Sequence, residues 1–258
     1  MSAGHDAHAL HRPGTSPVHR LAPEVKIVAA VGFAVAVVAT PREAFWAFGV
    51  YAGLVALVAA LARLPPGWLA RRALIVTPFL VFALALPFLG AGERVTVAGV
   101  SLSVDGLLGG WNILAKTLLG LCASLLLVGT TTVRDLMLGL DRLRCPHALT
   151  QIATFMLRYV DVLLAEGRRM RVARLSRGDD PRFLWQARGF AAGTGALFLR
   201  AYGRGERVWL AMRSRGYTGR MPSAWYEAGA ATVGQWAVAT SVPVVAAVVA
   251  VTATAVLR

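Results

Sequence analysis

Long uncharged apolar runs separated by arginine clusters constrain this chain more than any other feature. A helix that crosses a bilayer needs about 20 mainly apolar residues, and five runs come near or exceed that length, at residues 27–40, 44–62, 73–92, 106–132 and 228–257. Charged residues make up 16% of the 258 residues, whereas soluble domains carry about 25%. The sequence therefore predicts an all-α, polytopic membrane protein with about five transmembrane helices.

Glycine and proline residues predict how particular runs fold. Gly49 and Gly53 in the second run have the spacing that lets helices approach closely. Pro78 and Pro87 lie inside the third run, so we expect a kink or a break there. Residues 93–105, between the third and fourth runs, alternate in polarity and are predicted to form a short hairpin.

The basic residues predict how the helices are oriented. They precede the first run, lie between the second and third runs, and fill residues 133–227, which hold 17 arginines and eight acidic residues, a net charge of +9. Because cytoplasmic loops carry the excess of Lys and Arg, we expect a cytoplasmic amino terminus in the plasma (inner) membrane. The net charge of +14 could suggest nucleic-acid binding, but its placement follows membrane topology instead.

This topology divides the chain into four segments. They are a cytoplasmic tail (residues 1–25), membrane helices one to four (26–132), a cytoplasmic helical segment (133–227) and a carboxy-terminal membrane helix (228–258). No cleavable signal peptide is evident, because the first 20 residues are polar. Cys122 and Cys145 are expected to be unpaired.

Other polar residues predict neither catalysis nor a metal site in this chain. His5, His8 and His11 lie three apart, but Pro13 and Pro17 interrupt the segment and favour a flexible tail. No Gly-x-x-x-x-Gly-Lys-Ser/Thr loop is present, so ATP has to be bound by another chain. A charge such as Lys116, inside the fourth run, costs about 2.5–3.5 kcal/mol in a bilayer, so we expect it to make a buried polar contact.

The basic cytoplasmic segment is predicted to form amphipathic helices. The first spans residues 133–143, and two longer helices follow over residues 149–175 and from about 183 to 212. Gly189 and Gly193 would let the two long helices pack tightly where they cross. The segment is therefore expected to be a folded helical part rather than a linker.

Both long helices end in the same short sequence. The first closes with Ala173-Arg174-Leu175-Ser176-Arg177-Gly178, and the second with Ala211-Met212-Arg213-Ser214-Arg215-Gly216. One interpretation is two ordinary helix ends, because glycine caps helices and arginine suits the last turn. The other is that each end presents an arginine to a partner, since a guanidinium binds a carboxylate through two hydrogen bonds. Duplication would fit a two-fold or pseudo-two-fold partner.

With these two helix ends, the chain resembles the transmembrane T component of energy-coupling factor (ECF) transporters, which has two cytoplasmic helices ending in an x-Arg-x motif. Residues 16–26, Ser-Pro-Val-His-Arg-Leu-Ala-Pro-Glu-Val-Lys, are similar to the S-P-x-H-x-L-x-P-x-x-K of its cobalt branch, CbiQ. Three residues of this amino-terminal motif are expected to be structural: His19, Pro23 and Lys26. Thr130-Thr131, Arg158-Tyr159 and Glu166 are also similar to family patterns. The family motif is often Ala-Arg-Gly; both copies here begin with Ser, which leaves the arginine intact.

The resemblance implies a non-catalytic coupling subunit of an ATP-driven importer. Arg177 and Arg215 would enter surface grooves of two ATPase subunits, whose closure on ATP would push the long helices. This movement would reorient a membrane-embedded substrate-binding subunit. ATP and Mg would lie on the ATPases and cobalt ion on the substrate-binding subunit, so that this chain itself would bind no cofactor.

Several alternatives stay open. The amino-terminal motif favours cobalt, with nickel or a vitamin as other substrates, because nothing in this chain is expected to contact the ligand. A polytopic membrane enzyme acting on a lipid-linked substrate would need clustered acids, whereas the only adjacent acidic pair is Asp179–Asp180. A secondary transporter would show inverted repeats among its spans, whereas the repeat seen here lies in the cytoplasmic segment.

Overall fold

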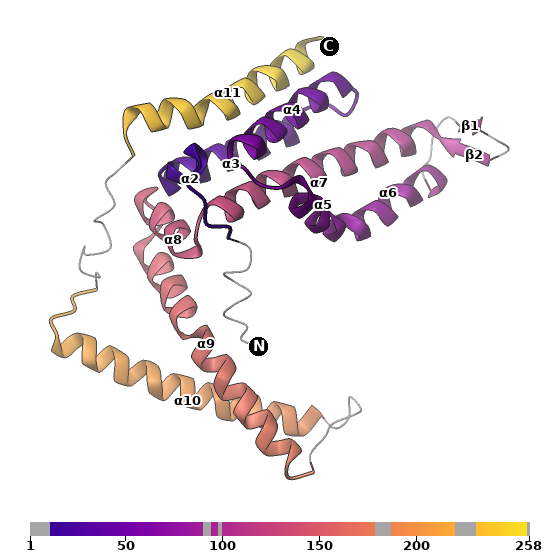
Figure 1. The fold of residues 1–258 in the computed structure, drawn as a ribbon. Coiled ribbons are helices and arrows are strands. Elements are labelled where there is room, and N and C mark those ends of the chain that lie inside the picture. The colour runs from indigo at the N-terminus through magenta and orange to yellow at the C-terminus, as the bar shows by residue number, and fades with distance from the viewer. Residues whose placement is uncertain (1–10, 90–93, 98–99, 179–186, 220–230, 257–258) are drawn as a thin grey trace. The chain divides into compact units, whose positions relative to one another are not determined.

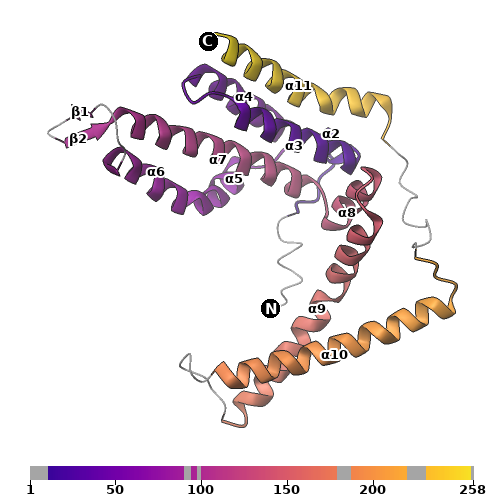
Figure 2. The same ribbon diagram turned by 180° about the vertical axis from the view of Figure 1, so that it is seen from behind.

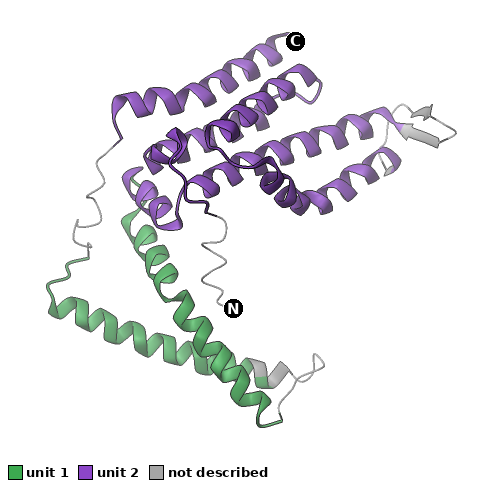
Figure 3. Cartoon of the chain, viewed as in Figure 1, with its two compact units in different colours: residues 1–8, 144–228 green, residues 9–143, 229–258 purple. Residues whose placement is uncertain are grey.

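A computed structural model describes residues 11–89, 94–97, 100–178, 187–219 and 231–256. Contacts divide the chain into two compact units, coloured separately in Figure 3. We call residues 9–143 with 229–258 the bundle unit, and residues 1–8 with 144–228 the crossed-helix unit. His5, His8 and the pair Asp179–Asp180 lie outside the described residues.

The bundle unit is built from helices and one hairpin. Its elements are α2 (Pro17–Arg20), α3 (Pro23–Ala39), α4 (Phe45–Leu61), α5 (Pro66–Ala73), the 3-10 turn η1 (Leu74–Val76), α6 (Thr77–Leu89), β1 (Arg94–Val97), β2 (Val100–Ser103), α7 (Val104–Thr130), α8 (Val133–Arg142) and α11 (Val233–Val256). α3 packs against α7, α8 and α11, and α6 lies along α7 (Figures 1 and 2). The all-α membrane fold is thereby confirmed.

Among the described residues, four helical stretches are long and apolar enough to cross a bilayer: Pro66–Phe88 (α5, η1 and α6 taken together), Val104–Thr130, His147–Leu175 and Val233–Val256. Two of the five predicted spans are absent from this group, because α3 and α4 have 17 residues each. Residues 147–175, predicted to be cytoplasmic, qualify instead. Their apolar stretch stops at Glu166, beyond which five arginines follow by residue 177, so this second half is too charged for hydrocarbon. Five spans stay a prediction.

The third apolar run is broken, as its prolines predict. The break falls at η1, which ends at Val76, two residues before Pro78. Pro78 has no N–H, so it cannot donate to the carbonyl of Leu74 four residues earlier. The hydroxyl of Thr77 donates to that carbonyl instead. Pro87 stays inside α6.

The predicted hairpin is confirmed: β1 and β2 pair antiparallel, with Arg94 opposite Ser103. It connects α6 to α7, which approach each other closely through glycines. A Cβ on Gly110 would lie 2.6 Å from the carbonyl oxygen of Ala83, and one on Gly106 would collide with that of Leu86. Only glycine therefore fits at these two positions.

A buried tyrosine links three helices in the core of the bundle unit. The Tyr51 hydroxyl donates to the carbonyl of Ala246 in α11 over 3.1 Å and lies 2.8 Å from the Thr40 hydroxyl at the end of α3. Tyr51 is fully buried, so its polar atom needs these partners. One side chain thus joins α4 to both α3 and α11.

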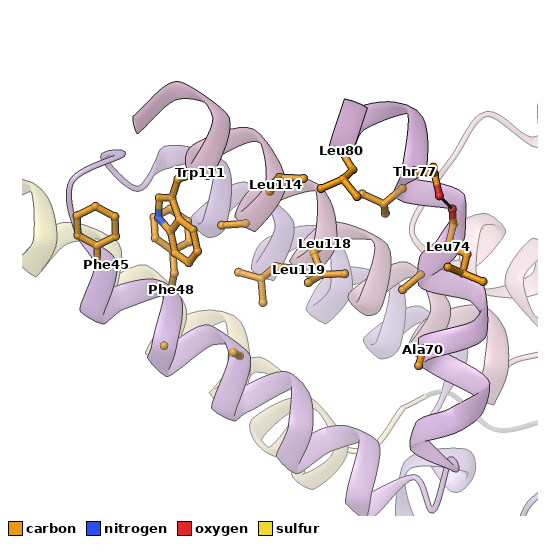
Figure 4. A pocket seen from close by; sticks show the side chains of 15 residues that line it. Phe45, Phe48, Ala70, Leu74, Thr77, Leu80, Trp111, Leu114, Leu118 and Leu119 are labelled. Atoms are coloured by element: carbon orange, nitrogen blue, oxygen red, sulfur yellow. Dashed lines mark hydrogen bonds between the residues drawn. The ribbon is translucent and has the colours of Figure 1, made fainter. Parts of the chain in front are cut away.

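An apolar groove of ≈ 730 Å³ opens beside α7, between α4 and the broken α5–α6 run (Figure 4). Phe45 and Phe48 line it from α4, Trp111 from α7 and Leu80 from α6. The close packing expected at Gly49 and Gly53 is not seen: apart from the adjoining backbone of α4, no atom of the described residues lies within 4 Å of a Cβ placed on either, and Gly49 lines the groove.

The crossed-helix unit consists of α9 (His147–Leu175) and α10 (Ala187–Ser214). The two helices cross, as Figures 1 and 2 both show. Small residues lie at the crossing, where a Cβ on Gly167 would meet Leu197 at 3.9 Å and one on Gly193 would meet Arg174 at 3.9 Å. The predicted long helices are confirmed, whereas the tight packing predicted at Gly193 is not seen, because a contact of 3.9 Å would leave room for a Cβ.

Candidate functional site

The end of α9 is a helix cap built by its Ser-Arg-Gly sequence. The Ser176 hydroxyl donates to the carbonyls of Val172 and Ala173, at 3.0 and 3.2 Å. The Gly178 N–H donates to the carbonyl of Leu175 over 3.0 Å, and Gly178 has a φ of +80°. This left-handed conformation favours glycine, so the chain turns directly after the arginine.

The end of α10 repeats this geometry. The Ser214 hydroxyl donates to the carbonyl of Ala211 over 3.0 Å, as Ser176 does to Ala173. The Gly216 N–H donates to the carbonyl of Arg213 over 3.0 Å, and Gly216 has a φ of +83°. The repeated sequence is therefore a repeated structure, in which the alanine carbonyl, the serine hydroxyl and the glycine turn have the same places.

At each cap, the arginine side chain has no hydrogen-bond or ion-pair partner among the described residues. Arg177 and Arg215 are exposed and make no side-chain hydrogen bond or ion pair with any residue that the structure describes. A neighbouring arginine is placed differently: the Arg213 guanidinium lies over the Trp209 ring at 5.3 Å from its centroid. Both ends can therefore offer an oriented cation to an acidic partner surface.

The crossing of α9 and α10 is held by an ionic contact. Glu166 of α9 pairs with Arg200 of α10 and with Arg169 one turn ahead, the latter at 2.6 Å. Hydrogen bonds from Arg169 and then Arg200 hold the pKa of the Glu166 carboxyl below its ordinary value. The Glu166 side chain is 17% exposed, whereas both arginines are more than 60% exposed. Glu166 therefore stays ionised between two cations at the point where the helices meet.

The amino-terminal motif lies in the bundle unit and not at the helix ends. His19 Nδ1 is 2.7 Å from the Ser16 hydroxyl, and Nε2 is 3.0 Å from the carbonyl of Arg12. Both ring nitrogens are thus engaged within the chain. Pro23 occupies the first turn of α3, where its missing N–H is not needed.

Lys26 joins the start of α3 to the end of α7. Its ammonium group donates to the carbonyls of His19 and Thr130, at 3.1 and 3.0 Å, and to the Thr131 hydroxyl at 3.3 Å. Only 8% of Lys26 is exposed. Three acceptors match its three N–H donors, so the buried ammonium group has a hydrogen-bond partner for each donor.

Glu24, within the same motif, is a structural residue that the sequence argument missed. Its carboxylate accepts hydrogen bonds from Arg142 of α8, at 3.2 Å, and from the backbone N–H of Ala231, at 3.1 Å. Gly139 lies against it, because a Cβ there would be 3.0 Å from the Glu24 nitrogen. The sequence did contain a sign of this role: a glutamate next to a predicted membrane helix has to be paired if it is buried.

Lys116 has a partner that the sequence could not identify, and the contact is exposed rather than buried as predicted. Its ammonium group donates to the carbonyl of Val38, in the last turn of α3, over 2.8 Å. Among the described residues no group of three or more His, Cys, Asp or Glu side chains could hold a metal ion, and Cys122 and Cys145 are free. The absence of a cofactor in this chain stays a prediction.

Comparisons with known proteins match most of the chain. The CbiQ family, described as "Cobalt transport protein", matches residues 14–224. The chain is 29% identical over 220 residues to the energy-coupling factor transporter transmembrane protein EcfT of Acidaminococcus fermentans, covering 80% of this chain and 81% of that protein. The EcfT protein of Bacillus selenitireducens is 29% identical over 221 residues, covering 80% and 82%. A putative fused cobalt transport protein CbiMQ of Methanocorpusculum labreanum is 29% identical over 109 residues, or 42% of this chain and 18% of that protein.

Proposed function

The chain belongs to the CbiQ family and is a multi-pass T component of an ECF transporter, and we propose that it couples ATP hydrolysis on two partner subunits to the import of cobalt ion. The single observation that carries the proposal is the pair of equivalent helix caps, each leaving an exposed arginine without a partner among the described residues. Family membership alone would leave open which residues couple.

Two equivalent caps suit two equivalent ATPase subunits. Arg177 and Arg215 would each enter an acidic groove on one ATPase, with Ser176 and Ser214 holding the last turn and Gly178 and Gly216 turning the chain away. A guanidinium stays charged and binds a carboxylate through two parallel hydrogen bonds. This pairing would fix both the position and the direction of each helix end.

The coupling step moves helices and makes no bonds in this chain. ATP and Mg would be held by the ATPases, since the sequence has no phosphate-binding loop. When the ATPases close, the two helix ends would be displaced and would carry α9 and α10 with them. Exposed apolar side chains on these helices, such as Met156 and Phe198, would pass the movement to a membrane-embedded substrate-binding subunit.

We further propose that the transported substrate is cobalt ion. This assignment is supported by the CbiQ family description and by the name of the fused CbiMQ relative, and by the match of residues 16–26 to the cobalt-branch motif. Nickel or a vitamin is the alternative, because the other relatives reported are EcfT proteins. The amino terminus and residues 133–227 are proposed to be cytoplasmic, following the arginine distribution.

The test replaces each arginine in the full complex. We expect Arg177→Ala or Arg215→Ala to weaken copurification of the ATPases about 30-fold, corresponding to about 2 kcal/mol for a central interface arginine. Arg171→Ala and Arg213→Ala are matched controls, because both residues are exposed on the same helices. Uptake of radioactive cobalt ion should fall with ATPase binding. Normal copurification and full transport in both single variants would contradict the assignment.

A further inference from the structure

The residue that follows the second cap reaches back to the beginning of α9. The Tyr217 hydroxyl donates to Gln151 Oε1 over 2.8 Å. The Tyr217 N–H meanwhile donates to the carbonyl of Met212, over 3.0 Å, as part of the α10 cap. Tyr217 therefore belongs to the end of α10 through its backbone and to α9 through its side chain.

Both polar atoms of the Gln151 side chain have partners within the crossed-helix unit. Its amide nitrogen lies 3.0 Å from His147 Nε2 and donates to the carbonyl of Gly219 at 3.5 Å. Because an amide nitrogen can only donate, its oxygen must face Tyr217. Gln151, His147 and Tyr217 are each half-buried, so the chain of hydrogen bonds is shielded in part from water.

The unit is thus joined at two separate places. Glu166 and Arg200 join the helices at their crossing, and Tyr217 joins the end of α10 to Gln151. Along α9 the two contacts are 15 residues apart, or about 22 Å at 1.5 Å per residue. With a single contact at the crossing, α10 could rotate relative to α9. A second contact at this distance from the crossing fixes the angle between the two helices.

We propose that Tyr217 is a positioning residue, which braces the end carrying Arg215 against the first turns of α9. The inference rests on the proposed function and adds that the two coupling ends differ. Displacement at Arg215 passes directly to residues 147–151 through the brace. Displacement at Arg177 reaches them along α9, because Arg177 directly follows the C-cap residue of that helix, or through the Glu166–Arg200 contact at the crossing.

The test removes one hydroxyl in the assembled complex. Tyr217→Phe keeps the ring, so ATPase copurification and ATP hydrolysis should stay within two-fold of the parent. Cobalt ions transported per ATP hydrolysed should fall at least three-fold. Tyr202→Phe is the matched control, since this α10 tyrosine is exposed and its hydroxyl has no partner among the described residues. Gln151→Leu should give the same loss, and combining it with Tyr217→Phe should add nothing further.

A spectroscopic arm does not depend on the substrate. Spin labels at positions 148 and 211, both exposed, are placed in a variant in which Cys122 and Cys145 are alanine. We expect Tyr217→Phe to broaden the distance distribution between the labels and Tyr202→Phe to leave it unchanged. An unchanged distribution in Tyr217→Phe would overturn the brace. If Arg215→Ala loses the ATPases while Tyr217→Phe changes nothing, the brace fails and the coupling function stands; normal copurification of Arg177→Ala and Arg215→Ala overturns the coupling function itself.

Discussion

Lys26 and Arg177 are both cations at helix termini, yet their surroundings are opposite. Lys26 lies in the first turn of α3, where the helix dipole disfavours a cation, and it is stabilised by three oxygen acceptors in a buried site. Arg177 follows the last turn of α9, where the dipole favours a cation, and it is exposed. The buried charge holds helices together inside the chain, whereas the exposed charge is available to another molecule.

This contrast predicts that variants around the buried Lys26 lose thermal stability, whereas variants at the exposed helix caps lose ATPase binding. Changes around Lys26 and Glu24 should lower stability while leaving the coupling of each folded molecule intact. Changes at the two caps should do the reverse. Loss of ATPase binding in stably folded molecules of a Lys26 or Glu24 variant would remove the distinction, as would a large loss of stability in Arg177→Ala or Arg215→Ala.

The largest stability loss is expected for Glu24→Ala. The variant removes the carboxylate that pairs with Arg142 and accepts the Ala231 N–H in a site where Glu24 is 4% exposed. Breaking a buried ion pair costs about 3 kcal/mol or more, which corresponds to a melting temperature about 6–12 °C lower. Thermal unfolding in detergent measures it. Glu43→Ala, whose carboxylate is 54% exposed and 3.8 Å from Arg42, should change little, and equal losses in both variants would contradict the prediction.

A smaller loss is expected for Lys26→Met. The methionine keeps an unbranched apolar stem but leaves the carbonyls of His19 and Thr130 without this donor. A buried acceptor deprived of its partner costs about 1–3 kcal/mol, so we expect about 2 kcal/mol by the same thermal assay. ATPase copurification per folded molecule should be unchanged. A loss of ATPase binding at unaltered stability would place Lys26 with the coupling residues instead.

Gly139→Ala tests the packing of α8 against the start of α3. Its Cβ would lie 2.9 Å from Ile27 Cδ1 and 3.0 Å from two backbone atoms of Pro23 and Glu24. Backbone atoms cannot yield easily, so we expect a loss of about 1–2 kcal/mol. Gly120→Ala is the control, because its position is open and alanine favours a helix; a stable Gly139→Ala would show that α8 can move away.

The smallest stability effect is expected at the caps. Gly178→Ala and Gly216→Ala place a Cβ on residues with φ of +80° and +83°, at about 1 kcal/mol each. Because the cap aims the preceding arginine, ATPase binding should weaken about five-fold, the same free energy expressed as affinity. Asparagine tolerates this conformation better and should recover part of the binding. A binding loss equal in the alanine and asparagine variants would argue against backbone conformation as the cause.

Local features of this fold could be predicted from the sequence. Pro78 predicted the break of the third run, because a missing N–H acts within four residues. The polarity alternation predicted the β1–β2 hairpin, and the repeated Ser-Arg-Gly predicted two equivalent caps. Each depends on neighbours along the chain, which the sequence displays directly.

Contacts between distant residues could not be predicted in this way. Lys26 meets Thr130 across 104 residues, Glu24 meets Arg142 across 118, and Tyr217 meets Gln151 across 66. A sequence shows that a buried charge needs a partner but not which of many polar groups is close. The same limit affected Gly49 and Gly53, whose spacing indicates close packing but does not say whether the second helix is in this chain.

The contact between Lys116 and the carbonyl of Val38 has a consequence for biosynthesis. α3 emerges from the ribosome before α7, so the acceptor is already in place when the lysine reaches the bilayer. Without α3, the Lys116 ammonium group would enter hydrocarbon without this carbonyl, at a cost that insertion measurements put at about 2.5–3.5 kcal/mol. Because α3 is synthesised first, the fourth apolar run can insert with a partner available for its lysine. The order of synthesis thus favours correct assembly of the bundle unit.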